Sequence, residues 1–351
     1  ANSVIVVCGD KSKVVSNSDM WETSTNYQTY QTQTTGFDGE GQITSAITYV
    51  TSENNPKVYW VTGHGEASES DLSTNFSDAI NKNNVEISDL ALMTDDIPED
   101  AEELVIMSPT TDFSEDEANK VITYLENGGK LLMFTSYTGT DMPNLDSILE
   151  NYGVKRSSGI VVETDSQHYY PQMPYYLLPN IQSDDITTEV KSNYILMPVA
   201  QAIQKLDSYR DTITIKSLLT TTEDAYIEND PENSTWSKSA DSETGAFDLG
   251  VSITETVDDK ETQIIYFSSA SMLSSQIDQA ISGANSKLAA TALTSMCDVE
   301  QTVVIPSKST SYTNLVFTQG AVNTWSIITI AGIPLVLVVI GVMIWMKRRK
   351  Q

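Results

Sequence analysis

The feature that most constrains this chain is a charge-free segment near its C-terminus, Trp325–Met346, read WSIITIAGIPLVLVVIGVMIWM. As a helix it would extend roughly 33 Å, which is enough to cross the hydrocarbon core of a bilayer. A tryptophan lies near each end, where amphipathic rings prefer the membrane interface. Pro334 falls mid-span, where a kink is tolerated in lipid. The segment predicts a C-terminal transmembrane helix and a single membrane crossing.

The residues after this segment predict its orientation. Lys347, Arg348, Arg349 and Lys350 follow at once, within a basic tail over 347–351. Positive charge beside a membrane span favours the cytoplasmic side. We therefore expect a plasma-membrane protein with a cytoplasmic C-terminus and with the bulk of the chain outside the cell.

Charge and cysteine content exclude several classes of partner and cofactor. The chain has 48 acidic and 20 basic residues, a formal net charge of −28, so its surface repels nucleic acid. Cys8 and Cys297 lie far apart and outside any metal-ligand spacing; one disulfide between them is possible but not required. The chain has no P-loop, no G-x-G-x-x-G and no H-E-x-x-H. We expect no metal and no cofactor.

The stretch Lys57–Glu66, read KVYWVTGHGE, predicts a candidate site. Its apolar β-branched and aromatic run is typical of a buried central strand. Gly63, His64, Gly65 and Glu66 then turn the chain toward a helix. In α/β proteins a strand, a glycine turn and a helix build sites at the carboxyl end of the sheet. The turn is either a ligand or active-site turn, or a tight connection whose glycines serve only packing.

Alternating elements surround this stretch. Apolar strands are expected at 85–90, 104–107, 131–134 and 160–162, with helices between them. One of these helices begins with a capping box at Ser114–Glu117 and ends at Gly128-Gly129. The order of strand, polar turn and helix predicts a doubly wound α/β domain with a mostly parallel sheet over 39–164.

The segments on either side of this domain have a different composition. The chain begins at Ala1 without methionine, and we expect 1–38 to hold the tail of a truncated upstream domain followed by an exposed loop over 16–35. Residues 165–322 contain several further strands, so they are expected to extend the same sheet or to form a second α/β portion rich in β-structure. Within them, 167–180 (QHYYPQMPYYLLPN) is rich in Tyr and Pro and is expected to be a loop folded over the sheet; a recognition surface is the alternative.

The residues of the glycine turn could also be catalytic. His64 could act as a base, with Glu66 to orient it or to act as an acid, and Ser108 and Ser268 follow strands and could line the same crevice. However, the chain has no G-x-S-x-G elbow, and neither cysteine occupies a strand-to-helix turn of that kind. A structural or ligand-contacting role for His64 is favoured over a catalytic one.

Several of these motifs together carry a family resemblance. They are F-D-G-E-G-Q-I-T-S-A-I (Phe37–Ile47), V-T-G-H-G-E (Val61–Glu66), S-P-x-x-D-x-S-x-x-E (Ser108–Glu117), L-x-N-G-G-K-L-L (Leu125–Leu132) and Y-Y-L-L-P-N-I (Tyr175–Ile181), with the C-terminal span and its basic tail. The sequence resembles the GldG-like, ABC-type uncharacterised transport-system auxiliary family of Gram-positive bacteria. The resemblance covers essentially the whole chain.

The resemblance implies a fold and a function. The α/β domain would be similar to glutamine-amidotransferase-like and GIFT domains, without the catalytic cysteine of the former. The chain would be a non-catalytic, membrane-anchored extracytoplasmic component that works with an ABC permease and ATPase in export or in a gliding-motility-like system. The resemblance carries over no catalytic residue, but Gly63, His64, Gly65 and Glu66 match the hallmark turn. Two alternatives stay open: a cell-surface hydrolase or carbohydrate-binding protein that uses His64 and Glu66, and a surface protein that self-associates.

Overall fold

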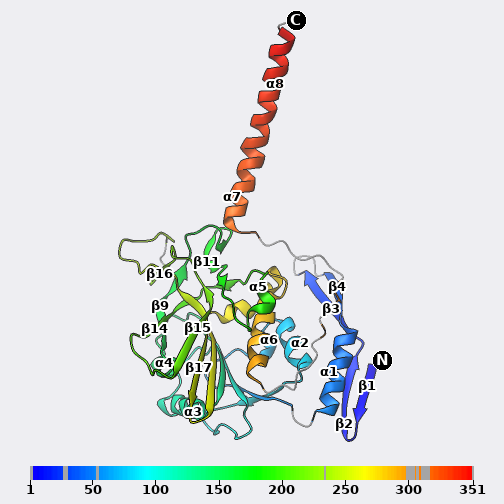
Figure 1. Ribbon diagram of the computed structural model, residues 1–351, viewed down its shortest axis with the longest axis vertical. Helices are drawn as coiled ribbons and strands as arrows, with labels where there is room; N and C mark the ends of the chain where they lie inside the picture. Colours follow the sequence, from blue (N-terminus) through cyan, green and yellow to red (C-terminus); the bar gives the residue numbers. More distant parts are fainter. Residues whose placement is uncertain are drawn as a thin grey trace.

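The computed structural model describes residues 3–26, 31–52, 55–232, 235–297, 305, 308–309 and 317–349. It has a mixed α/β body from which one long helix projects (Figure 1). The helices of the body are α1 (Gly39–Thr51), α2 (Thr74–Lys82), α3 (Glu115–Glu126), α4 (Pro143–Asn151), α5 (Ser275–Ala280) and α6 (Ala284–Met296), with short 3₁₀ turns at Glu69–Asp71, Thr188–Val190 and Ala270–Leu273.

One large mixed sheet forms the centre of the body. Its eleven strands include the order β16-β9-β14-β17-β18-β8-β7-β5-β6, and β15 pairs with both β17 and β12. The strands are β5 (Lys57–Val61), β6 (Glu86–Leu90), β7 (Glu103–Met107), β8 (Lys130–Phe134), β9 (Val154–Val162), β12 (Asn180–Ile181), β14 (Gln201–Lys205), β15 (Ile213–Thr220), β16 (Tyr226–Glu228), β17 (Asp248–Val257) and β18 (Lys260–Phe267).

The expectation of a mostly parallel sheet holds over only part of this sheet. Strands β6, β5, β7, β8 and β18 run parallel to one another. The remaining pairs, including β17 with β18, are antiparallel. The direction changes because Asp258 and Asp259 both adopt positive φ, 50° and 62°, and close a two-residue hairpin between β17 and β18. Strands from 165–322 thus continue the sheet that begins before residue 164.

Helices cover both faces of the parallel part. Along β7, Val105 and Met107 pack in one apolar core with residues of α2 and α6, whereas Leu104 and Ile106 pack in a second core with residues of α3 and α4. This division follows from the alternation of side chains along a strand. Every residue of β7 is buried, which explains why the central strands are recognised as continuous apolar runs.

The N-terminal part forms two smaller sheets beside the body. Strands β1 (Ser3–Cys8) and β2 (Lys11–Ser16) form an antiparallel hairpin. Strands β3 (Trp21–Asn26) and β4 (Gln31–Phe37) pair with each other, and β4 also pairs with β19 (Lys308–Ser309). The prediction of a loop over 16–35 is therefore wrong for 21–26 and 31–35, which are strands, and 27–30 lie outside the described residues. The repeated threonines of this segment are β-branched residues that favour strand.

The Tyr- and Pro-rich segment is also more regular than expected. Strand β11 (Met173–Leu177) lies between β10 (Tyr169–Tyr170) and β13 (Met197–Pro198) in a three-stranded sheet. These strands are short, because each proline removes a backbone donor from the ladder.

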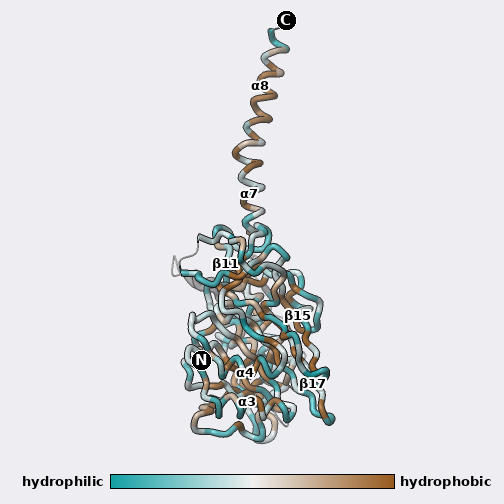
Figure 2. Tube along the Cα trace, turned by 90° about the vertical axis from the view of Figure 1, so that its left-hand side faces the viewer, coloured by the Kyte–Doolittle hydropathy of each residue, from teal (hydrophilic) through white to brown (hydrophobic). Residues whose placement is uncertain are grey.

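The long helix ends the chain. It consists of α7 (Gln319–Ile327), a π-helical turn at Ile328–Gly332, and α8 (Ile333–Arg349). The turn directly precedes Pro334, which has no N–H to give to the carbonyl of Ile330. Over Gln319–Arg349 the helix is long and apolar enough to cross a membrane, and it extends away from the body as a run of mostly hydrophobic residues (Figure 2). Lys350 of the basic tail lies outside the described residues.

Candidate functional site

The glycine turn follows β5 as the sequence predicts. Gly63 and Gly65 have φ values of 123° and 77°, which favour glycine strongly. Gly65 has a second constraint, because a Cβ atom at this position would collide with the hydroxyl of Thr110. Around Gly63 that space is empty. The two glycines thus reverse the chain, and their different surroundings show that the backbone of Gly65 is packed closely against the neighbouring loop.

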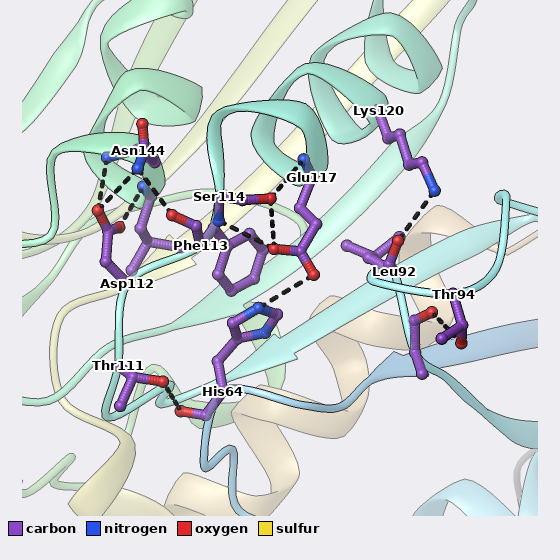
Figure 3. A network of polar contacts seen from close by, with 12 residues as sticks. His64, Leu92, Thr94, Thr111, Asp112, Phe113, Ser114, Glu117, Lys120 and Asn144 are labelled. Carbon is purple, nitrogen blue, oxygen red and sulfur yellow. Dashed lines mark hydrogen bonds and ion pairs between the residues drawn. The ribbon is translucent and has the colours of Figure 1, made fainter.

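The side chain of His64 points toward Phe113 and Glu117 (Figure 3). It is only 4% exposed. Its Nδ1 lies 3.0 Å from Oε1 of Glu66, and its backbone N–H donates to Oε2 of the same carboxylate over 2.6 Å. Residues two positions apart thus close a small ring around the turn, and this ring fixes the orientation of the imidazole.

A second carboxylate approaches the other side of the ring. Nε2 of His64 lies 3.2 Å from Oε1 of Glu117, at the start of α3. These two atoms are outside hydrogen-bond geometry, so their attraction is that of an ion pair. Burial alone would raise the pKa of Glu117, but hydrogen bonds from Ser114 and the charge of His64 outweigh it and hold that pKa below its ordinary value.

Two buried carboxylates therefore flank one imidazole ring, one at each ring nitrogen. The ring is also packed against Phe113, with ring centroids 4.1 Å apart. We call the three residues His64, Glu66 and Glu117 the buried ion cluster.

The backbone of the turn is held by the loop that precedes α3. The carbonyl of His64 accepts the backbone N–H groups of Thr110 and Thr111, over 2.9 and 3.0 Å, and also their hydroxyls. Gly63, Gly65, Thr110 and Thr111 are themselves exposed. We call these four residues the rim. The buried ion cluster therefore supports a solvent-exposed polar rim at the carboxyl end of β5 and β7.

The structure separates the two candidate serines. Ser108 is half-buried at the end of β7, has a φ of 54°, and donates from its hydroxyl to Oγ of Ser136 over 2.8 Å. Ser268 follows β18 at the same edge but is fully buried, and its hydroxyl donates to the carbonyl of Leu249. Ser268 thus has no exposed surface, and within the described part of the chain neither serine hydrogen-bonds to His64.

Glu117 is the member of the buried ion cluster that sequence reasoning assigned only to helix capping. It does form the capping box with Ser114, through a side chain that accepts from the Ser114 N–H over 2.9 Å. The same carboxylate also faces His64. The signal was present in the S-P-x-x-D-x-S-x-x-E motif, but a single sequence gives no means of placing that motif over the glycine turn.

The geometry limits what this site can do chemically. Both nitrogens of His64 face carboxylates of its own chain, so neither nitrogen is open to a substrate. Among the described residues, no group of three or more His, Cys, Asp or Glu side chains is placed to hold a metal ion. Cys8 is exposed, Cys297 is buried, and both are free thiols. The site is thus a rigid, internally paired turn with a polar rim.

These features define a class: an α/β protein with one candidate membrane anchor. They are the mixed α/β body, the turn around the buried His64, and the helix that could cross a membrane. The particular family follows from a family-model match over residues 55–295. The chain belongs to the family described as ABC-type uncharacterized transport system. No curated protein matches the chain.

Among solved structures, the mmIFT52 N-terminal domain is similar in fold, with a TM-score of 0.50 and 15% identity, over 68% of this chain and 96% of that one. An exo-beta-1,4-mannosidase, Op5Man5 from Opitutaceae bacterium strain TAV5, matches at a TM-score of 0.35 and 10% identity, over 72% of this chain and 37% of its own. A thua-like protein from Parabacteroides merdae matches at a TM-score of 0.37 and 12% identity, over 76% of this chain and 99% of its own.

Proposed function

We propose that this chain is a membrane-anchored, extracytoplasmic and non-catalytic auxiliary component of an ABC-type transport system. The observation that carries the proposal is the family match over 55–295, in a chain that also ends in a helix able to cross a membrane. Lys347, Arg348 and Arg349 at the end of α8 support a cytoplasmic C-terminus and a body outside the plasma membrane. The partners would be the permease and ATPase subunits, and export or a gliding-motility-like role is the finer form of the proposal.

We further propose that the rim contacts a ligand or a partner subunit. The buried ion cluster holds the rim in shape, so His64 and Glu66 act by positioning Gly63 and Gly65, and Ser108 supports the loop that leads to Thr110. Pre-organised backbone and hydroxyl groups at a sheet edge lose little freedom on binding, which favours association. Ser268 would contribute only to the packing of this edge.

Co-purification tests both parts of the proposal. The tagged full chain, extracted from its native membranes in mild detergent, should retain an ABC permease and ATPase. Thr110→Arg places a bulky cation on the rim and should reduce their recovery, whereas Thr214→Arg, at an exposed position on β15, should not. Absence of both subunits from the native preparation would contradict the transport assignment. Equal recovery with Thr110→Arg would contradict the rim as the contact.

The burial of His64 favours this proposal over a cell-surface hydrolase. A general base must reach the proton that it removes, yet this ring is 4% exposed and faces two carboxylates. Self-association stays a prediction, and the mass of the detergent-solubilised chain, measured over a range of concentrations, would test it.

A further inference from the structure

The hairpin formed by β10 and β11 lies beside the base of the long helix in both views of the body (Figures 1 and 2). Three contacts fix it there. The N–H of Gly320 donates to the carbonyl of Ser166 over 2.6 Å, and the N–H of Gln172 donates to Oε1 of Gln319 over 2.8 Å. The hydroxyl of Thr318, the N-cap of α7, donates to the side chain of Gln167. The hairpin and the helix therefore form one unit.

The position of these contacts along the helix sets the depth of the hairpin. Gly320 precedes Trp325, where the predicted span begins, by about 7.5 Å of helical rise. The headgroup layer on each side of a bilayer is about 5–8 Å thick. A hairpin bonded at Gly320 is therefore level with the lipid headgroups when α8 crosses the membrane.

The surface of the hairpin suits that layer. Tyr170 and Met173 are 37% and 38% exposed, and Tyr169 is half-buried. No Asp, Glu, Lys or Arg occurs over 166–183, although the chain as a whole carries a net charge of −28. Tyrosine prefers the membrane interface because its ring is apolar and its hydroxyl hydrogen-bonds to water and headgroups. The uncharged hairpin thus meets the uncharged start of the anchor.

We infer that the β10–β11 hairpin is a second membrane contact, which seats Tyr170 and Met173 among the headgroups of the leaflet that α7 enters. This inference rests on the proposed membrane anchoring by α8. Two points of contact fix the tilt of the body on the membrane, whereas a lone helix would leave it free to swing. Because the hairpin has no charged residue, the contact needs no anionic lipid and is insensitive to salt.

Fluorescence quenching in the full-length chain tests this inference. Tyr170→Cys in a Cys8→Ser background is labelled with NBD and reconstituted in phosphatidylcholine vesicles that contain spin-labelled lipid. Cys297 is 8% exposed and stays unlabelled under native conditions. The label at position 170 should emit at shorter wavelength in the vesicles than in buffer without vesicles. Its emission should be quenched more by a spin label on the lipid headgroup than by one deep in the acyl chain. Neither effect should change with added salt or with anionic lipid.

Two matched labels separate the possible outcomes. Val338→Cys, in α8, should be quenched most by the deep label, and a failure there would overturn the anchor itself. Val257→Cys, on the β17–β18 hairpin at the end of the body opposite α7, should not be quenched. Quenching at 338 without quenching at 170 would overturn the second contact alone. Protection of position 170 only in the presence of a permease would show that a protein, not lipid, covers the hairpin.

The contacts to α7 give a further variant. Gln319→Ala removes the acceptor of the Gln172 N–H and should lower the quenching at position 170 while leaving that at 338 unchanged. Asn323→Ala, one turn further along α7, removes a partner of the Gln319 side-chain amide but leaves the Gln319 carbonyl oxygen in place, so it should have the smaller effect. Equal quenching in all three proteins would contradict the role given to Gln319.

Discussion

Nε2 of His64 lies 3.2 Å from Oε1 of Glu117, which joins the turn after β5 to the first turn of α3. Both side chains are almost fully buried, and Glu66 closes the opposite side of the ring. The two carboxylates therefore hold the imidazole of His64 from opposite sides. The pair therefore ties together two segments that are remote in the chain.

Loss of the His64 ring should destabilise the body strongly. His64→Gln leaves Glu66 and Glu117 buried without their shared partner, and removing one partner of a buried ion pair costs about 3–5 kcal/mol. Urea unfolding of the full-length chain in detergent would measure the change in the free energy of unfolding. Lys57→Ala, which breaks the exposed pair with Asp100, is the control and should cost far less, because solvent screens an exposed ion pair.

The double variant His64→Gln, Glu117→Gln should recover part of that loss, because it removes one of the two uncompensated carboxylates. If His64→Gln alone lowers the free energy of unfolding no more than Lys57→Ala does, then the buried ion cluster does not stabilise the body as proposed.

Glu117 should contribute to the acid limb of stability. Its pKa is below the ordinary value of 4.5 in the folded chain, so between the two values the unfolded chain binds more protons. The stabilisation is complete above pH 4.5 and is lost as the pH falls through the lower, folded value. Melting temperatures measured downward from neutral pH should therefore fall less steeply in Glu117→Gln than in the native chain. Glu115→Gln, at an exposed position two residues earlier, should leave the slope unchanged.

Glu103 should change the pH dependence of stability in the opposite direction to Glu117, so that stability falls as the pH rises. It is fully buried in β7, where burial raises its pKa well above the ordinary 4.5 although the thiol of Cys297 hydrogen-bonds to it. The folded chain then keeps a proton that the unfolded chain has lost, so stability falls as the pH rises from 4.5 toward the folded value. Glu103→Gln removes this decline.

Thermal unfolding between about pH 5 and pH 8 would test the role of Glu103. The native chain should lose stability across this interval to a greater extent than Glu103→Gln, and Glu99→Gln, an exposed control, should behave as the native chain does. If the difference in stability between the native chain and Glu103→Gln is the same at pH 8 as at pH 5, then Glu103 is not a neutral, buried carboxyl.

Local signals explain which elements the sequence predicts well. The apolar run of β5 and the capping box of α3 are fixed by residues within a few positions of one another, and both occur in the structure as expected. The pairing of β8 with β18 joins segments more than a hundred residues apart, and no local pattern specifies it. The hairpin turn at Asp258-Asp259 does have a local signal, because aspartate tolerates positive φ in turns, but two adjacent aspartates alone do not distinguish a hairpin from a solvated loop.

The candidate site divides in the same way. The glycine turn and the contact between His64 and Glu66 are local, and the sequence places them. The approach of Glu117 and Thr110 depends on the packing of α3 against the sheet, which one sequence without an alignment does not reveal. The burial of Ser268 likewise follows from β17 lying beside β18, so a serine after a strand was not enough to make it a surface residue.

The two glycines of the turn should differ in their tolerance of alanine. At Gly63 the only cost is the positive φ of 123°, about 1–3 kcal/mol for a residue with a side chain, because nothing lies near the new methyl group. At Gly65 a similar cost is joined by a collision with the Thr110 hydroxyl, which also donates to the carbonyl of His64. Gly65→Ala should therefore destabilise the chain more than Gly63→Ala in urea unfolding.

The Thr110 hydroxyl can be tested directly. Thr110→Ser keeps the hydroxyl, and Thr110→Ala removes it, so Gly65→Ala should be milder in the Thr110→Ala background than in the Thr110→Ser background. Equal effects in the two backgrounds would mean that the loop before α3 does not pack on Gly65, and that the rim is looser than its hydrogen bonds to His64 imply.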